Sequence, residues 1–379
     1  MAGIYIHIPF CRKACHYCNF HFSTSVKQTD EMAQAICKEA LLQCNYINEP
    51  IATIYFGGGT PSLLSSENLK AVIDKLRELF TIDADAEITL EANPDDINEI
   101  KLKEWKSLGI NRLSIGVQSF FEHDLQWMNR AHNAGQAIQS IKLAQANGFT
   151  NITIDLIYGT PTLSDTKWQQ NFETAVALNV PHISCYALTV EPKTALEKMI
   201  AQHKIENVDA GTQSRQFELL MEWMAAAGYE HYEISNFAKP GHRSRHNSSY
   251  WQGKQYLGLG PSAHSFDGSS RQWNVANNAL YIKSIEQNVL PFEKEILTAT
   301  QQLNEYIMTS LRTMEGLSLQ FIIAKWGKDF VNKIVLASKK YLNEGMMFEK
   351  DQHLILSREG KLFADGIAAE LFAPAPKGV

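Results

Sequence analysis

The stretch GIYIHIPFCRKACHYC, residues 3–18, places an alternating apolar strand directly before three closely spaced cysteines. Isoleucines at every second position face one side of this predicted strand, and Tyr5 and His7 face the other. Chemically active side chains directly after a strand are typical of folds whose sites lie at the carboxyl ends of parallel strands. The stretch therefore predicts a functional site where the first strand ends.

Working outward, five more strands follow, each separated from the next by a helical pattern. The strands are predicted at residues 51–56, 86–92, 111–117, 151–159 and 182–188, and the helices near residues 30–47, 65–80, 96–109, 134–148 and 166–179. Six βα units imply a parallel sheet that is covered by helices. Because a closed barrel needs eight units, we expect an α/β protein with an open three-quarter (β/α)6 barrel.

Composition narrows the class of protein. The 379 residues carry a net charge of -6, from 35 basic and 41 acidic residues, so no general positive field favours nucleic acid as a partner. The chain shows neither a signal-peptide pattern nor an apolar run of membrane-spanning length. We therefore expect a cytoplasmic protein with at most transient contact at the inner face of the membrane. In that reducing compartment its six cysteines favour metal ligation over disulfides.

The three cysteines of the opening stretch, Cys11, Cys15 and Cys18, form the pattern CxxxCxxC. Thiolates are soft ligands, and four of them complete an iron–sulfur cluster. Three thiolates would leave one iron of a 4Fe-4S cubane open to a small molecule. The alternative from spacing alone is a zinc site, with His16 or His21 as its fourth ligand.

Glycines and polar residues also follow the later strands. The second strand ends in GGGT, residues 57–60, where three glycines let the backbone approach a ligand closely. The polar side chains near the ends of the next three strands are Glu91, Gln118, Arg130 and Asp155. Since the carboxyl ends of parallel strands meet at one rim, we expect this set to hydrogen-bond the sugar and amino-acid parts of a nucleoside ligand.

Four motifs, YIHIPFCRKACHYC, GGGTPS, LSIGVQSF and IDLIYGTP, resemble those of the radical S-adenosylmethionine (SAM) enzymes. Within them the match is to the oxygen-independent coproporphyrinogen III oxidase group, and it covers nearly the whole chain. The resemblance implies a 4Fe-4S cluster on Cys11, Cys15 and Cys18, with SAM at the fourth iron. In this family one electron from the cluster cleaves SAM to a 5′-deoxyadenosyl radical. The residues that should contact SAM, carried over by position, are Tyr5, Tyr17, Gly58, Gly59, Thr60, Glu91, Gln118, Arg130 and Asp155.

Two features differ from the true oxidases. Their cysteine loop reads CxxxCxxCxC, whereas Phe20 occupies the last position here, and their long segment before the first strand has no counterpart ahead of Gly3. Both features are similar to those of a sister group, the HemW-type haem chaperones, which also share an HNxxYW element. This chain has HNSSYW at residues 246–251.

The residues of that element suit haem independently of the resemblance, although packing alone also accounts for a histidine beside aromatic rings. His246 offers an axial ligand for the iron, and Tyr250 and Trp251 offer flat faces to a porphyrin. Arg243 and Arg245 could meet the two propionates through charge-assisted hydrogen bonds. Two further histidines belong to this prediction: His242 as an alternative ligand and His264 as part of the same wall.

The resemblance favours a haem chaperone that binds haem, a 4Fe-4S cluster and SAM. Its expected partners are haem, a client haem protein of respiratory type and an electron donor for the cluster. The alternative function is an oxygen-independent coproporphyrinogen III oxidase or another radical SAM enzyme of porphyrin metabolism. Both differences from the oxidases argue against decarboxylation of coproporphyrinogen.

We expect three domains along the chain. Residues 1–195 form the partial barrel with the cluster and SAM site, and residues 196–290 form a helical connector that carries the haem-binding stretch. Residues 291–379 form a mainly helical domain that resembles the winged-helix-like tail of the family. For this last domain we expect a lid or a docking surface for a client, because the acidic total argues against nucleic acid.

Overall fold

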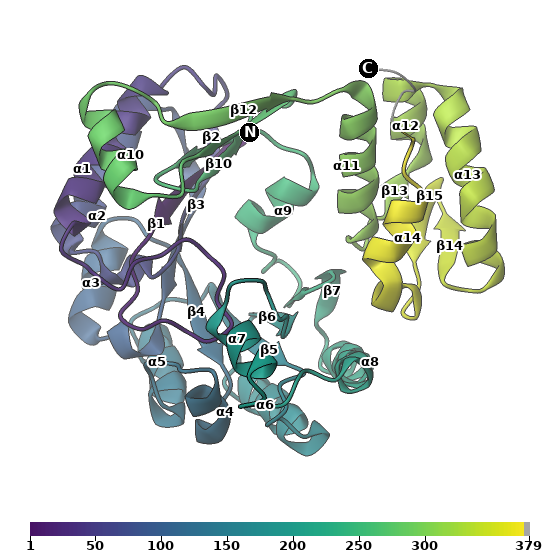
Figure 1. Cartoon of the computed structure of the whole chain (residues 1–379), viewed down its shortest axis with the longest axis horizontal. Coiled ribbons are helices and arrows are strands. Elements are labelled where there is room, and N and C mark those ends of the chain that lie inside the picture. The colour runs from purple at the N-terminus through teal and green to yellow at the C-terminus, as the bar shows by residue number, and fades with distance from the viewer. Residues whose placement is uncertain (375–379) are drawn as a thin grey trace.

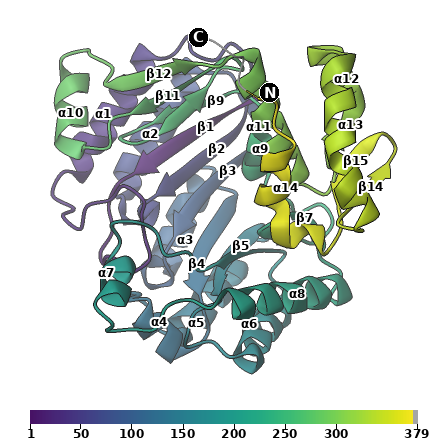
Figure 2. The same ribbon diagram turned by 45° about the vertical axis from the view of Figure 1, so that its right-hand side comes forward.

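The computed structural model describes residues 1–374 and contains the six predicted strands. They are β1 (Ala2–Ile8), β2 (Ile51–Gly58), β3 (Ile82–Ala92), β4 (Arg112–Gln118), β5 (Ile152–Tyr158) and β6 (His182–Ala187). Each pairs in parallel with the next, and the six fan into an open, curved sheet (Figure 2). The prediction of an open α/β barrel is confirmed.

The helices that cover the outside of this sheet also follow the prediction (Figure 1). They are α1 (Thr29–Leu42), α2 (Ser66–Leu79), α3 (Glu99–Ser107), α5 (Ala134–Ala146) and α6 (Asp165–Ala177). Ser65 caps α2 by accepting a hydrogen bond from the backbone N–H of Asn68. Glycines with positive φ, Gly109 and Gly148, follow α3 and α5. A short helix, α4 (Glu122–Trp127), was not predicted.

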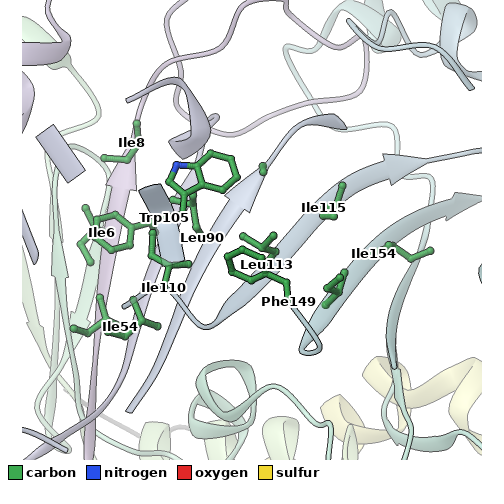
Figure 3. Packing of buried hydrophobic residues seen from close by; sticks show 14 of the residues in the cluster. Ile6, Ile8, Ile54, Leu90, Trp105, Ile110, Leu113, Ile115, Phe149 and Ile154 are labelled. Atoms are coloured by element: carbon green, nitrogen blue, oxygen red, sulfur yellow. The ribbon is translucent and has the colours of Figure 1, made fainter. Parts of the chain in front are cut away.

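The main core lies between the sheet and these helices, as Figure 3 shows. Alternate residues of β1, such as Ile6, lie in this core together with Ile54 of β2 and Leu90 of β3, and Trp105 of α3 is 1% exposed. Burying each such side chain contributes about 1.5–3 kcal/mol. Because the isoleucines of β1 occupy this layer, the side chains between them face the inside of the barrel.

The segment expected as a helical connector does more than link two domains. It contains α7 (Ala195–Ala201), α8 (Ala210–Ala226), α9 (Arg245–Trp251) and α10 (Asn278–Glu286), and also β7 (Glu230–Glu233), β8 (Asn236–Ala238), β9 (Tyr256–Leu259), β10 (His264–Phe266) and β11 (Ser270–Asn274). With β12 (Phe292–Ile296), these strands extend both edges of one twelve-stranded sheet. The strands have three to five residues, too few for a periodic pattern. They form because the open edges of β1 and β6 offer unpaired backbone groups.

A buried carboxyl, Glu39 of α1, joins this extension to the barrel. It accepts hydrogen bonds from the backbone N–H of Gly260 at 2.8 Å, from Nδ2 of Asn274 at 2.7 Å and from the hydroxyl of Tyr281 at 2.5 Å. Burial raises its pKa to about 7. The extension is therefore fixed to α1 by a polar cluster within the core.

The C-terminal domain has a core of its own. Its elements are α11 (Ala299–Leu311), β13 (Leu317–Ser318), α12 (Leu319–Trp326), α13 (Lys328–Asn343), β14 (Met347–Lys350), β15 (His353–Leu356) and α14 (Ala364–Glu370). The expected hairpin and closing helix are present, and α9 lies between this domain and the barrel (Figure 1). Within residues 1–374, every helix is too short or too polar to cross a membrane.

Candidate functional site

A cavity of about 670 Å³ opens at the carboxyl ends of the barrel strands, and we call it the rim cavity. It brings together eleven of the twelve residues predicted to hold the cluster or SAM. They are Cys11, Cys15, Tyr17, Cys18, Gly58, Gly59, Thr60, Glu91, Gln118, Arg130 and Asp155. The predicted contact Tyr5 is not among the lining residues. Phe20, which stands in the place of a fourth cysteine, also lines the cavity and is 65% exposed.

Tyr5 instead lies inside the barrel. Its ring is 6.1 Å from that of Tyr55 and 6.4 Å from that of His246, measured between ring centroids. Its hydroxyl hydrogen-bonds Nδ1 of His7 at 3.2 Å. In this arrangement Tyr5 packs among Tyr55, His7 and His246, and its predicted contact with SAM stays a prediction.

The cysteine loop is held by hydrogen bonds at its start and at its middle. The N–H of Cys11 donates to the carbonyl of Ser23 at 3.0 Å, and the N–H of His16 donates to the carbonyl of Met128 at 3.2 Å. Asn129 donates to the carbonyl of Ala14 at 2.7 Å. These contacts position the loop, and its three cysteines line the rim cavity.

The three thiols line the same rim cavity. Among the described residues, no group of three His, Cys, Asp or Glu side chains is close enough to surround a single ion. A zinc ion needs its ligands around one point, whereas a cubane binds each thiolate at a different iron. Of the two histidines of the zinc alternative, His16 hydrogen-bonds the carbonyl of Trp127 through Nδ1, and His21 hydrogen-bonds Asn278 through Nε2, so each keeps its other ring nitrogen for a metal. The cluster and the zinc alternative both stay predictions for this loop.

Arg130 connects the cysteine loop to two strands. Its guanidinium donates to Sγ of Cys15 at 3.2 Å, to Oδ1 of Asn93 at 2.7 Å and to the carbonyl of Gly116 at 2.8 Å. Asn93 in turn donates to the hydroxyl of Thr60 at 3.2 Å. The guanidinium thus places a fixed positive charge beside the Sγ atom of Cys15.

Burial opposes ionisation of the thiols in the free protein. It raises the pKa of Cys11 to about 11 and also raises the pKa of Cys18. The hydroxyl of Thr60 donates to Sγ of Cys11 at 3.5 Å and offsets part of this effect. Iron binding would therefore displace protons from these thiols.

The glycines after β2 are needed because side chains at these positions would clash with other parts of the chain. Gly58 has φ +104°, and a Cβ atom there would lie 2.6 Å from the imidazole of His7. A Cβ atom on Gly59 would lie 2.7 Å from the carbonyl oxygen of Phe10. The sequence predicts that these glycines make room for a ligand, and the structure shows that they also make room for β1 and the start of the cysteine loop.

Two half-buried carboxyls, Glu91 and Asp155, give the cavity its electrostatic character. Burial raises the pKa of Glu91 to about 8 and that of Asp155 to about 6. Oε1 of Glu91 accepts a hydrogen bond from the hydroxyl of Tyr55 at 2.7 Å. A cationic ligand would stabilise both carboxylates, and the sulfonium and amino groups of SAM have that charge.

The sequence analysis did not predict Asn93 or Tyr55 as parts of the site. It also did not predict that His7 positions the glycine loop. Asn93 follows Glu91 by two positions, which is the one local signal that could have found it. His7 lies under Gly58 and bonds the carbonyl of His21 at 2.9 Å, so it connects the glycine loop with the segment after the cysteines.

The HNSSYW element forms α9 at the opposite, amino-terminal side of the barrel strands. His246 is 1% exposed, and its ring nitrogens contact two hydroxyls: Nδ1 is 2.8 Å from Thr53, and Nε2 is 2.8 Å from Tyr250. Its ring stacks on Tyr55 at 4.9 Å between centroids. Glu87 of β3 accepts the backbone N–H of His246 at 3.0 Å. In this arrangement His246 fixes α9 to the barrel.

A second cavity of about 450 Å³ lies between α9 and the C-terminal domain, and we call it the interdomain cavity. Residues from both sides line it, among them Arg243, Ser248, Trp251, Tyr306, Phe321 and His353. Arg312 separates the two cavities, because it lines the rim cavity while its guanidinium lies 5.4 Å from the centre of the Trp251 ring.

The remaining predicted haem residues are divided by the fold. Arg243 lines the interdomain cavity and pairs with Glu315 at 2.8 Å. Arg245 instead pairs with Asp85 of β3 at 3.3 Å, so the two arginines have different surroundings. The two further histidines, His242 and His264, are not among the lining residues of the interdomain cavity, and His264 stacks on Trp273.

The chain matches two family models: the radical SAM superfamily over residues 5–175 and the HemN C-terminal domain over residues 297–363. The heme chaperone HemW of Bacillus subtilis is 34% identical over 371 residues, which cover 97% of this chain and 98% of that protein. The heme chaperone HemW of Escherichia coli is 31% identical over 379 residues, which cover 98% and 97%. Among solved structures, coproporphyrinogen III oxidase (HemN) of Escherichia coli has a TM-score of 0.85 at 22% identity, over 98% of this chain and 90% of its own. This last likeness shows a common fold.

Proposed function

The chain belongs to the HemW family of radical SAM proteins, and from that membership we propose that it binds haem and delivers it to a client haem protein. The observation that carries the proposal is the HNSSYW element on α9, which stands between the barrel and the C-terminal domain with Trp251 on a cavity wall. A carrier needs its cargo near the surface and between parts that can separate. The client that we propose is a respiratory haem protein.

The proposal includes a cluster on Cys11, Cys15 and Cys18 and SAM in the rim cavity. When bound, the cluster supplies an iron with an open coordination position and one electron from an electron donor. Arg130 then holds positive charge beside Cys15, and Glu91 and Asp155 accept hydrogen bonds from the cation and the sugar hydroxyls of SAM. The donor set fits these groups, because three thiols, two carboxyls with raised pKa values and one fixed guanidinium share one cavity.

The proposed haem contacts are His246, Tyr250 and Trp251. In the present arrangement the hydroxyl of Tyr250 occupies Nε2 of His246. Ligation of the haem iron through Nε2 therefore requires this hydroxyl to leave. Rotation of the Tyr250 side chain would free Nε2, whereas movement of α9 as a body would release only Nδ1 from Thr53, because His246 and Tyr250 belong to the same helix. Trp251 needs no such movement, since it already lines the interdomain cavity.

The test is a titration of the purified protein with haemin, followed by the Soret band. The wild type should bind haemin saturably, and the loaded protein should transfer haem to the apo form of an added haem protein. His246→Ala should weaken binding or change the Soret position, whereas His123→Ala, which removes an exposed imidazole on α4, should do neither. Absence of saturable binding in the wild type would remove the proposal.

The second candidate is a coproporphyrinogen III oxidase or another radical SAM enzyme. The completeness of the rim cavity favours it, since the thiols, glycines and polar residues lie together. Protein reconstituted anaerobically with iron and sulfide would be given reductant, SAM and coproporphyrinogen. Multiple turnovers to decarboxylated product, absent from a Cys15→Ala control, would establish the enzyme and displace the chaperone as the main function.

A further inference from the structure

The interdomain cavity has the walls that a large planar ligand requires. Trp251 of α9 lines one side, and Tyr306 and Phe321 of the C-terminal domain line the other. The rings of Tyr306 and Phe321 pack with centroids 4.7 Å apart, and Phe321 is 45% exposed. The volume of about 450 Å³ lies within the usual range of small-molecule sites. Aromatic faces with an open edge suit a conjugated ring that must also leave.

The two faces of α9 have different roles. His246 and Tyr250 are four residues apart, so they share the face that is fixed to the barrel. Ser248 and Trp251 line the interdomain cavity. The Nε1 atom of Trp251 is buried and has no hydrogen-bond partner within residues 1–374, which leaves one donor unsatisfied beside this cavity.

The interdomain cavity also contains an imidazole that is prepared to bind a metal. Nδ1 of His353 lies 2.9 Å from the backbone carbonyl of Asp351. A carbonyl oxygen only accepts hydrogen bonds, so Nδ1 carries the proton and Nε2 carries the lone pair. This arrangement is the one that orients histidine ligands in metal sites. No partner of Nε2 is found in the described part of the chain.

The local fold holds this imidazole in place. Asp351 and Gln352 both have positive φ, at 50° and 60°, and form the tight turn between β14 and β15. His353 follows directly and pairs with Ser318 of β13. The carbonyl that fixes the tautomer therefore belongs to a turn of defined geometry, and it does not depend on a flexible loop.

We propose that the interdomain cavity is the place where haem docks, with Nε2 of His353 as a ligand of the iron and Trp251 against the porphyrin face. This inference rests on the proposed binding of haem and adds a residue outside the HNSSYW element. It assigns different tasks to the two histidines in the present arrangement. Nε2 of His353 binds the haem iron, whereas His246 fixes α9 to the barrel through Thr53.

The experiment compares haemin titrations of the full-length wild type with those of His353→Ala and His353→Asn. Asparagine retains a side-chain N–H near the position of Nδ1 and can keep the hydrogen bond to Asp351, but it has no atom at the position of Nε2. Both variants should bind haemin about tenfold or more weakly, with a shifted Soret band. Excess free imidazole should restore the wild-type spectrum in His353→Ala. His123→Ala is the matched control, and unfolding midpoints verify that all variants fold.

The outcomes separate this inference from the proposed function. If the wild type shows no saturable binding, the proposed function fails. If the wild type binds and His353→Asn matches it in affinity and Soret position, haem binding stands but His353 is not a ligand. Loss of binding in His246→Ala alone would also overturn the assignment of His353. Weakened binding in both His353 variants, with rescue by imidazole, supports it.

Discussion

Replacement of Gly58 by alanine tests whether contact with β1 shapes the glycine loop. The backbone at Gly58 has φ +104°, and a Cβ atom would lie 2.6 Å from two atoms of the His7 imidazole. A left-handed conformation costs an L-residue about 1–2 kcal/mol, and overpacking of a buried contact adds roughly 1–3 kcal/mol. We therefore expect Gly58→Ala to lower the free energy of unfolding by about 2–5 kcal/mol.

The matched control is Gly241→Ala. Gly241 also has positive φ, at +82°, but a Cβ atom there would have no atom within 4 Å. Its loss should be about 1–2 kcal/mol, which is the conformational part alone. A second comparison uses His7→Ala, which removes the ring that the new methyl group would meet. In that background Gly58→Ala should cost about as much as Gly241→Ala.

The assay is urea unfolding of the metal-free protein, with far-UV circular dichroism and tryptophan fluorescence as two probes whose transitions must coincide. After anaerobic reconstitution, Gly58→Ala should also bind SAM more weakly, because the loop carries Thr60 on the cavity wall. The reasoning is refuted if Gly58→Ala costs no more than Gly241→Ala, or if its cost is the same with and without the His7 ring.

Three further results are expected. Arg130→Lys should retain iron but bind SAM about tenfold or more weakly, as measured by equilibrium dialysis. The reason is that one ammonium group cannot contact both Asn93 and Cys15 as the guanidinium does. An unchanged affinity for SAM would contradict this role of Arg130. SAM affinity should rise as pH increases toward about 8, since Glu91 ionises there and attracts a cation, and Glu91→Gln should remove that slope in the same dialysis. Folding raises the pKa of Glu39 from 4.5 to about 7, so the folded state binds more protons than the unfolded state between these pH values. The free energy of unfolding should therefore fall as pH rises through this interval, by at most roughly 3 kcal/mol. Glu39→Gln should flatten this part of the urea-measured pH profile, and an unaltered profile would show that Glu39 is not responsible.

Local patterns in the sequence were sufficient to predict the barrel and most of the rim cavity. Alternation in β1 and the helical repeats between strands are local signals, so the six βα units could be recognised one at a time. Parallel strands place their carboxyl ends on one side as a consequence of topology. That rule is why Glu91, Arg130 and Asp155, which lie far apart in the chain, could be predicted to meet.

The edges of the sheet depended on tertiary structure. Strands such as β8, with three residues, have no periodicity of their own and form by pairing with β6. The same is true of the polar contacts of Glu39, which join α1 to residues more than 200 positions later. Such pairings depend on two kinds of group in the folded chain. These are the backbone N–H and C=O groups that the first six strands leave unpaired, and the buried polar groups that need hydrogen-bond partners.

The sequence by itself showed which residue types are present for the proposed metal, SAM and haem binding, because the CxxxCxxC and HNxxYW patterns are contiguous. It did not determine which way each side chain faces. His246 meets Thr53 across 193 positions and is buried, whereas Trp251 on the same short helix lines a cavity shared with His353. The direction of a side chain depends on which surfaces pack around its helix, and the barrel and the C-terminal domain supply those surfaces only in the folded chain.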